Sequence, residues 1–177
     1  MSLPTPSVKT IALSRVSIKP FLVMGLLSAS IFLPSLIHQQ AITGPLINAI
    51  LLLTTSLAGP SAAIMTGLIP SVVALSRGLL PVVLAPVVPF IMIANAVYII
   101  VFAQLKEKSF AGAVAAASVL KFGFLHLVSQ VLLAQLLPGK FLTIASKMMS
   151  WPQLATALVG GLIAWVALQT INDSKHN

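Results

Sequence analysis

The sequence predicts an all-α membrane protein, a polytopic bundle of six transmembrane helices. Hydrophobic residues make up 58% of the 177 residues and charged residues only 7%, whereas a soluble domain carries roughly 25% charged residues. The mean hydropathy is +1.08, so we expect lipid rather than water to cover most of the surface. The apolar runs are continuous, which favours helices over the alternating strands of a membrane barrel.

We expect one transmembrane domain, residues 18–171, between a polar N-terminal tail, residues 1–17, and a polar C-terminal tail, residues 172–177. The first apolar run, 21–37, follows a basic start. That pattern also fits a signal peptide, with a small-residue cleavage site at 28–30. Because hydrophobicity continues past this site, we interpret the run as the first transmembrane helix.

The second and third apolar runs cover residues 42–57 and 61–75, and Gly59-Pro60 predicts a tight turn between them. The fourth run, 79–105, contains three prolines near its start, which a regular helix interior does not accept. We therefore predict a partly inserted loop over 79–85.

The fourth helix is expected to begin at Pro86 or Pro89, because proline suits the first turn of a helix. The fifth run covers 110–137 and the sixth covers 151–171, with a short amphipathic interfacial segment over 140–149 between them. Runs of about 16 to 27 residues are compatible with ~30 Å of hydrocarbon at 1.5 Å per residue.

Basic residues lie mostly at the ends of the apolar runs, where they orient a membrane protein. With both termini inside, six basic residues fall on the inner side and three on the outer, which favours this orientation. The inner set is Lys9, Arg15, Lys19, Lys106, Lys108 and Lys175, and the outer set is Arg77, Lys140 and Lys147. The same placement argues against nucleic-acid binding as the reason for the net charge of +8.

The sequence lacks the residues that most enzyme reactions require. The chain has no cysteine, and its two acidic residues, Glu107 and Asp173, lie near predicted membrane edges. Carboxylate pairs for acid–base catalysis are therefore not expected. There is no phosphate-binding glycine loop and no H-E-x-x-H motif. We predict a protein that is not an enzyme and carries no cofactor or metal.

Polar side chains within the fifth run are the strongest functional signal, because ionisable groups at membrane depth are costly. His126 and Gln130 are four residues apart and share a helix face, with Ser129 beside it. We expect this face to line a cavity, the alternative being a packing histidine. Lys121 either lies deep in the bundle or extends to the inner interface, depending on where the membrane span begins.

With both termini inside, the polar residues converge on the outer half of the bundle. Arg77 and Trp151 have interfacial anchoring as an alternative role, and Asn48 and Asn95 either line the pocket or join helices. We predict a substrate pocket formed by His38, Gln39, Arg77, Asn95, His126, Gln130, Trp151 and Gln153.

Small residues four apart on the first helix, Gly25 and Ala29, allow close approach of another helix. They predict either a contact within the bundle or a docking surface for a partner protein.

These features together resemble the substrate-binding S component of energy-coupling factor (ECF) transporters. The similar segments are residues 43–50, the Gly59-Pro60 turn, the Arg77-Gly78 loop and residues 86–96. The resemblance extends over roughly residues 18–171.

The resemblance implies a six-helix subunit of a prokaryotic cytoplasmic membrane, with both termini inside. It implies a pocket on the outer side for a vitamin-like solute or a metal. It also implies partners, a transmembrane scaffold subunit and two ATPase subunits, with Gly25 and Ala29 contacting the scaffold. Two other functions stay open: a structural or assembly subunit of a larger membrane complex, and a small channel or flippase.

Overall fold

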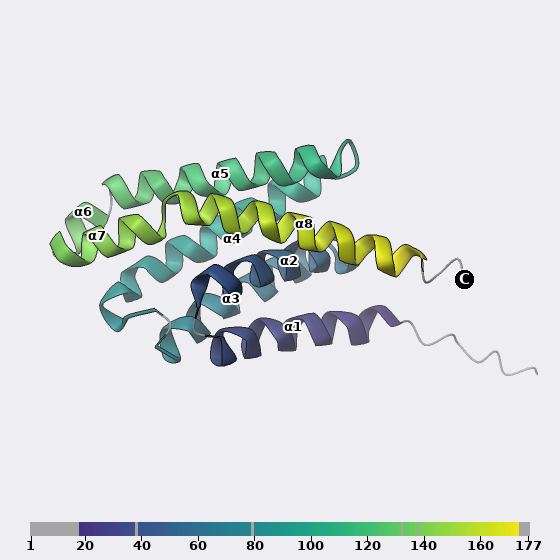
Figure 1. Cartoon of the computed structure of the whole chain (residues 1–177), viewed down its shortest axis with the longest axis horizontal. Helices are drawn as coiled ribbons and strands as arrows, with labels where there is room; N and C mark the ends of the chain where they lie inside the picture. The colour runs from purple at the N-terminus through teal and green to yellow at the C-terminus, as the bar shows by residue number, and fades with distance from the viewer. Residues whose placement is uncertain (1–17, 38, 79, 132, 138, 174–177) are drawn as a thin grey trace, which may run out of the picture.

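The computed structural model describes residues 18–37, 39–78, 80–131, 133–137 and 139–173, and these residues contain helices and no strand. The predicted all-α bundle is confirmed (Figure 1). The elements are α1 (Ile18–Leu36), α2 (Gln40–Ala58), α3 (Pro60–Ser76), the 3₁₀ helix η1 (Val82–Val87), α4 (Val88–Leu105), α5 (Phe110–Val131), α6 (Leu133–Leu136), α7 (Gly139–Met148) and α8 (Trp151–Asp173).

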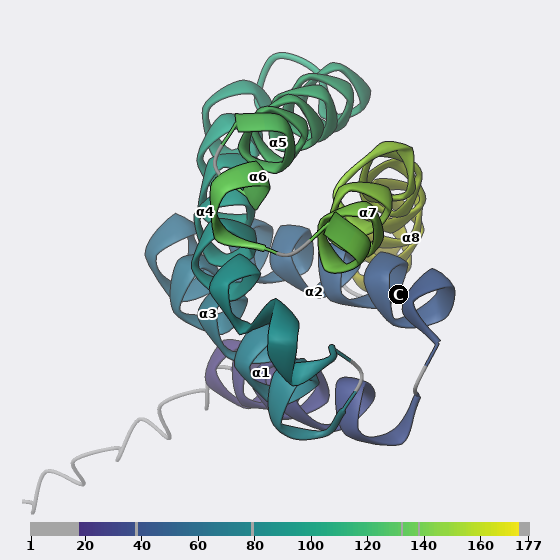
Figure 2. The ribbon, with the colours of Figure 1, turned by 90° about the vertical axis from the view of Figure 1, so that its left-hand side faces the viewer.

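The long helices run up and down along one axis, so that their connections gather at two ends (Figure 1). Helix α1 begins and α8 finishes at one end, here called the terminal end. The opposite end carries α6, α7 and η1 and is here called the pocket end. Figure 2 looks onto the pocket end and shows α2 among the other long helices. Helix α2 packs against α1, α3, α4 and α8, which makes it the central helix of the bundle.

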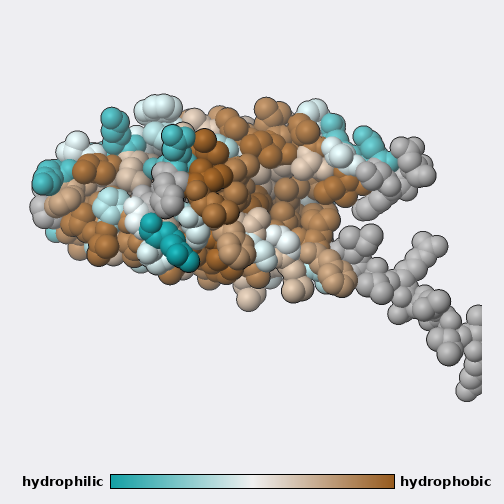
Figure 3. Space-filling view, turned by 60° about the horizontal axis from the view of Figure 1, so that its bottom comes forward, coloured by the Kyte–Doolittle hydropathy of each residue, from teal (hydrophilic) through white to brown (hydrophobic). Residues whose placement is uncertain are grey.

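The described helices have the length and composition of membrane spans. Four stretches are long and apolar enough to cross a membrane: Gln40–Ala58, Val82–Leu105, Phe110–Leu136 and Gly139–Asp173. Two shorter apolar helices, Pro20–Leu36 and Pro60–Ser76, accompany them. In Figure 3 hydrophobic residues cover the middle of the visible face, and hydrophilic residues gather toward its ends. This distribution is compatible with a membrane protein.

Two apolar clusters fill the bundle. The cluster nearer the terminal end packs α2, α4, α5 and α8 together around fully buried side chains such as Leu51, Phe102 and Ala157. The cluster at the pocket end joins η1 and α5 to α6 and α7, with Leu84 and Leu125 at its centre. Between the clusters lies the polar group described below.

Helix α8 approaches α2 closely because two adjacent glycines lie at the contact. A Cβ atom at Gly160 would lie 2.5 Å from the Cβ of Asn48 and 2.8 Å from the carbonyl oxygen of Pro45. A Cβ atom at Gly161 would overlap the side chain of Val114 on α5. Small residues at such positions let membrane helices pack backbone to backbone.

The proline-rich segment before α4 is more regular than predicted. Of the two predicted starts, Pro86 and Pro89, Pro89 lies in the first turn of α4, which begins one residue earlier at Val88. Residues 82–87, however, form a 3₁₀ helix, whereas a loop was expected over 79–85. Pro86 has no N–H, so one i to i+3 hydrogen bond of this short helix is not made.

The short amphipathic segment predicted after the fifth run is present as α7, with Lys140 and Lys147 exposed. Helix α8 continues to Asp173, past the predicted end at residue 171. The predicted N-terminal tail, residues 1–17, lies outside the described residues.

Candidate functional site

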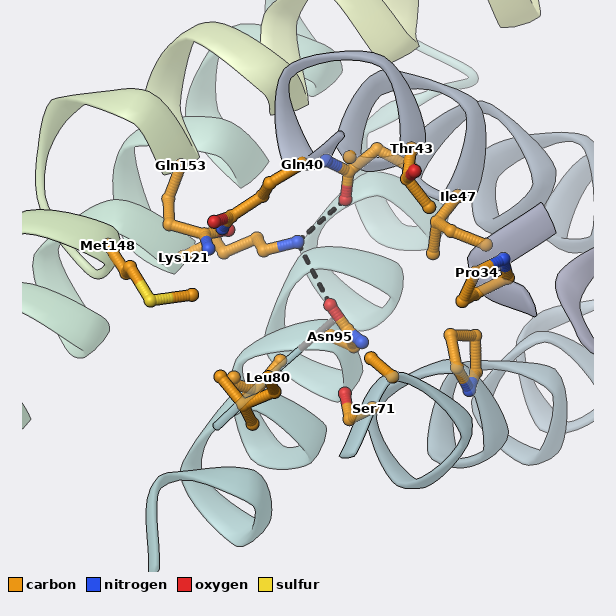
Figure 4. Close-up of a pocket in the computed structure, with 15 residues that line it drawn as sticks. Pro34, Gln40, Thr43, Ile47, Ser71, Leu80, Asn95, Lys121, Met148 and Gln153 are labelled. Atoms are coloured by element: carbon orange, nitrogen blue, oxygen red, sulfur yellow. Dashed lines mark hydrogen bonds between the residues drawn. The ribbon is translucent and has the colours of Figure 1, made fainter. Parts of the chain in front are cut away.

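A pocket of about 120 Å³ lies at the pocket end of the bundle. Six helices contribute to its wall: the end of α1, the start of α2, the end of α3, the first half of α4, the middle of α5 and the start of α8. Met148 of α7 and Leu80, which precedes η1, complete the lining. Figure 4 shows these side chains around the space between the helices.

Lys121 of α5 lies in the wall of this pocket and is only 2% exposed. Its Nζ donates hydrogen bonds to Oδ1 of Asn48, at 2.6 Å, and to Oδ1 of Asn95, at 2.9 Å (Figure 4). A buried ammonium requires such acceptors, because removing it from water without partners is costly. The two asparagines replace part of its hydration shell.

The three polar residues meet because their helices place them at similar depth. At 1.5 Å per residue, Asn48 lies roughly 12 Å from the start of α2, Asn95 roughly 11 Å from the start of α4, and Lys121 roughly 15 Å from the end of α5. All three of these helix termini are at the pocket end. Because the three residues lie at similar depth, their side chains can form hydrogen bonds across three helices.

Neighbouring groups fix the orientation of this polar contact. Nδ2 of Asn95 donates a 3.1 Å hydrogen bond to the carbonyl oxygen of Gly67, which ties α4 to α3. The ring of Tyr98 lies below Lys121, with Nζ 5.1 Å from its centroid, a cation–π geometry. The Tyr98 hydroxyl donates a 2.9 Å bond to the carbonyl oxygen of Ala157 on α8.

Several donors remain available to a bound molecule. Nδ2 of Asn48 and the side-chain amides of Gln40 and Gln153 line the pocket without a hydrogen bond to any described residue. The hydroxyl of Ser71 is likewise unpaired among the described residues. Lys121 is the one charged side chain among the residues that line the pocket. The pocket is therefore rich in hydrogen-bond donors, and the amine of Lys121 is its basic group.

Two of the predicted site residues, Asn95 and Gln153, line this pocket. Gln39, Arg77 and Trp151 lie at the pocket end but outside the lining; all three are exposed, Trp151 by 68%. Their exposure fits the anchoring role that was the alternative for Arg77 and Trp151. His38 lies outside the described residues.

The predicted inward orientation of His126 and Gln130 is wrong, because both side chains are exposed on the outer face of α5. His126 stacks against Phe122 on the same helix, with ring centroids 5.7 Å apart. The inward face carries Lys121 and Leu125 instead. At about 100° per residue, His126 lies roughly 140° around the helix from Lys121, so the two cannot face the same cavity.

Lys121, Asn48 and Gln40 were not among the predicted pocket residues, although Asn48 was expected either to line the pocket or to join helices. The sequence allowed Lys121 either a position deep in the bundle or one at the inner interface. Its side chain is only 2% exposed, so it lies deep in the bundle. The available signal was the presence of Asn48 and Asn95 at matching depth in two other apolar helices. Gln40 was visible only as part of a polar connection.

Gly25 and Ala29 do not form a common free face. Gly25 is exposed, and a Cβ atom there would meet nothing within 4 Å. Ala29 is partly buried and packs against the cluster nearer the terminal end. Ala29 therefore makes the intramolecular contact that was one of the two expectations.

No group of three or more His, Cys, Asp or Glu side chains that could hold a metal ion occurs within the part of the chain that the structure describes. No protein-family model, curated protein sequence or solved structure matches this chain.

Proposed function

We propose that this protein is the solute-binding subunit of an uptake transporter of the ECF type, and that it captures a small solute on the outer side of a prokaryotic cytoplasmic membrane. The observation that carries the proposal is the pocket at one end of the bundle, with the buried ammonium of Lys121 in its wall. Ionisable groups at membrane depth generally mark substrate or ion sites.

The distribution of basic residues supports an outward-facing pocket. The terminal end carries Lys106 and Lys108 in the connection between α4 and α5. The predicted tails, with Lys9, Arg15 and Lys175, adjoin α1 and α8 in the sequence. The pocket end carries Arg77, Lys140 and Lys147. By the positive-inside rule the terminal end is cytoplasmic, so the pocket opens outward.

The packing below the pocket supports a binding subunit over a channel. Tyr98, Ile99 and Phe102 are completely buried on α4 and lie between the pocket and the terminal end. Together with the cluster nearer the terminal end, they leave the pocket closed below Lys121. A solute that enters from the pocket end therefore needs a further conformational change, driven by partners, to cross.

Such partners agree with the chain's composition, because it carries no phosphate-binding glycine loop of its own. We propose that a transmembrane scaffold subunit and two ATPase subunits supply the energy. The outer face of α1 supports docking of a scaffold, because Phe21, Met24 and Phe32 are large hydrophobic side chains that are more than half exposed.

The proposal is tested by purifying the protein from its native membrane under mild conditions and analysing it by native mass spectrometry. We expect one small molecule per chain and a stable complex with a scaffold and ATPases. Recovery of the chain with membrane-protein partners but with no bound molecule, and with no binding to a solute panel, would favour a structural subunit and overturn the proposal.

A further inference from the structure

The pocket around Lys121 has two chemically different sides. Lys121, Gln40 and Gln153 lie together on one side, and Pro34 and Ile47 lie on the other (Figure 4). The apolar lining also includes Pro70, Leu80, Ile91 and Met148, and Met148 lies beside Gln153 and Lys121 (Figure 4). A ligand that matches this lining has a polar, acceptor-rich end and a hydrocarbon end.

The charge of the polar side selects the sign of the ligand. The acidic residues of the chain are Glu107 and Asp173, and both lie at the terminal end, away from the pocket. A cationic ligand would lie beside the ammonium of Lys121 without a compensating carboxylate. An anion would instead gain charge-assisted hydrogen bonds from Lys121 and from Nδ2 of Asn48.

The donor count of Lys121 agrees with an anion. An ammonium has three N–H donors, and two of them are used by the amide oxygens of Asn48 and Asn95. The third makes no hydrogen bond to a described residue, and the ring of Tyr98 lies 5.1 Å from Nζ. Because the asparagine oxygens hold the ammonium from the side of α2 and α4, the site is organised before the ligand arrives, which reduces the cost of binding.

The volume limits the part of the ligand that the pocket encloses. A protein cavity of about 150 Å³ accepts benzene, so a pocket of about 120 Å³ encloses a ligand of roughly six carbon-sized atoms or fewer. An inorganic anion would fill the polar side and leave the apolar wall without a partner.

We propose that the solute is a small organic monocarboxylate. Its carboxylate accepts hydrogen bonds from Lys121 and Asn48, and its short hydrocarbon part lies against Pro34, Ile47 and Leu80. This inference rests on the proposed function and narrows it, because it excludes metal ions, amines and neutral solutes of the same size.

Three ligands that share a carbon skeleton provide the test: butanoate, butanamide and butylamine. Each is titrated against the purified full chain in detergent, and binding is measured by calorimetry and by the midpoint of thermal unfolding. We expect butanoate to bind and to raise the midpoint, and the amide and the amine to do neither. Chloride and inorganic phosphate are included as anions without an apolar part.

Substitutions test whether butanoate binds beside Lys121. Lys121→Met is expected to weaken butanoate binding by about tenfold or more, and Lys108→Met, a lysine at the terminal end, to leave it unchanged. If Lys121→Met does not fold, Gln153→Leu serves as the second variant, with a smaller expected loss. Loss of binding in Lys108→Met as well would point to non-specific attraction by net charge and overturn the proposal.

The outcomes separate the solute class from the function. Equal or tighter binding of butanamide or butylamine overturns the carboxylate and leaves a solute-binding subunit standing. Equal binding of phosphate or chloride shows an adventitious ion only, and also overturns the organic ligand. If no ligand binds and the protein from native membranes carries no small molecule, both proposals fail.

Discussion

The ammonium of Lys121 donates a 2.6 Å hydrogen bond to Oδ1 of Asn48, a residue 73 positions earlier in the chain. The bond joins α5 to the central helix α2 inside a largely apolar bundle, and a second bond from the same nitrogen joins α5 to α4 through Asn95. The same group thus holds three helices together and forms the charged wall of the pocket. Stability and ligand binding are expected to depend on the same atoms.

The energetic weight of this contact is measurable with a double-mutant cycle. Asn48→Leu removes one acceptor from a buried ammonium and is expected to lower the free energy of unfolding by about 1–3 kcal/mol. Lys121→Met is expected to cost less, because an apolar residue of similar length can replace a buried polar group without leaving a charge unpaired.

The double variant Lys121→Met/Asn48→Leu is expected to be more stable than Asn48→Leu alone, because the charge that lacked an acceptor is gone. Reversible unfolding in mixed micelles gives the three free energies relative to the unmodified chain. Strictly additive losses would show that the two side chains do not interact in solution.

A second prediction concerns the close contact of α8 with α2. Gly160→Ala introduces a Cβ atom 2.5 Å from the Cβ of Asn48, and overpacking of this kind costs about 1–3 kcal/mol. The matched control is Gly123→Ala on α5, where the new Cβ meets nothing within 4 Å. The control is expected to be neutral or slightly stabilising, since alanine favours a helix over glycine by about 1 kcal/mol.

Thermal unfolding of the two alanine variants side by side checks this prediction. Because Gly160 contacts Asn48 directly, the displacement is also expected to weaken ligand binding in Gly160→Ala and not in Gly123→Ala. Equal stability of both variants would mean that α2 and α8 are farther apart in the membrane than described.

A third prediction separates the two roles of Tyr98. Tyr98→Phe removes the hydrogen bond to the carbonyl oxygen of Ala157 and keeps the ring under Lys121. Hydrogen bonds between membrane helices average about 0.6 kcal/mol, so we expect a small loss of stability. Tyr98→Leu also removes the cation–π contact, which adds roughly 0.5–2 kcal/mol.

Unfolding of Tyr98→Phe and Tyr98→Leu under identical conditions gives the contribution of the ring by difference. The loss from Tyr98→Leu is expected to shrink when Lys121 is replaced by methionine, because no cation then lies above the ring. An unchanged loss in that background would assign the effect of the ring to packing alone.

How far the sequence predicts this structure depends on the scale considered. The helical class and the positions of the long helices follow from continuous apolar runs, and the helix start at Pro89 follows from the fixed φ of proline. The 3₁₀ geometry of η1 was missed, because closely spaced prolines exclude an α-helix interior without excluding a tighter helix.

The site was predicted only in part, because composition does not fix which face of a helix points inward. Helix α5 has only a weak amphipathic pattern, so His126 and Lys121 were equally acceptable as inward residues. Packing against α2 and α4 selects Lys121, and about 140° of helical rotation then places His126 outside. Contacts between residues far apart in the sequence therefore determine which face of α5 points inward.

A fourth prediction concerns orientation in the membrane. The chain has no cysteine, so single cysteines can be introduced without background labelling. Lys140→Cys, exposed on α7 at the pocket end, is expected to react with a membrane-impermeant maleimide in intact cells. Lys108→Cys, in the connection between α4 and α5, is expected to react only after the membrane is permeabilised.

The labelling difference must come from the side of the membrane on which each cysteine lies, and not from the intrinsic reactivity of its thiol. Both cysteines are therefore also labelled in detergent, where equal reaction is expected. The reverse pattern, with Lys108→Cys accessible in intact cells, would place the pocket on the cytoplasmic side. Uptake from outside would then be excluded as the role of the pocket.

The last prediction distinguishes the pocket from the polar face that the sequence favoured. Gln153 lines the pocket, whereas His126 and Gln130 are exposed on the outside of α5. Gln153→Leu removes a neutral donor and is expected to weaken binding of a carboxylate by roughly fivefold, or about 1 kcal/mol. His126→Leu and Gln130→Leu are expected to leave the affinity unchanged, because neither side chain contacts the pocket. Calorimetric titration of the three leucine variants gives the affinities directly. A loss of affinity in His126→Leu that matches the loss in Gln153→Leu would mean that the solute binds along the outer face of α5, and that the pocket beside Lys121 is a structural feature alone.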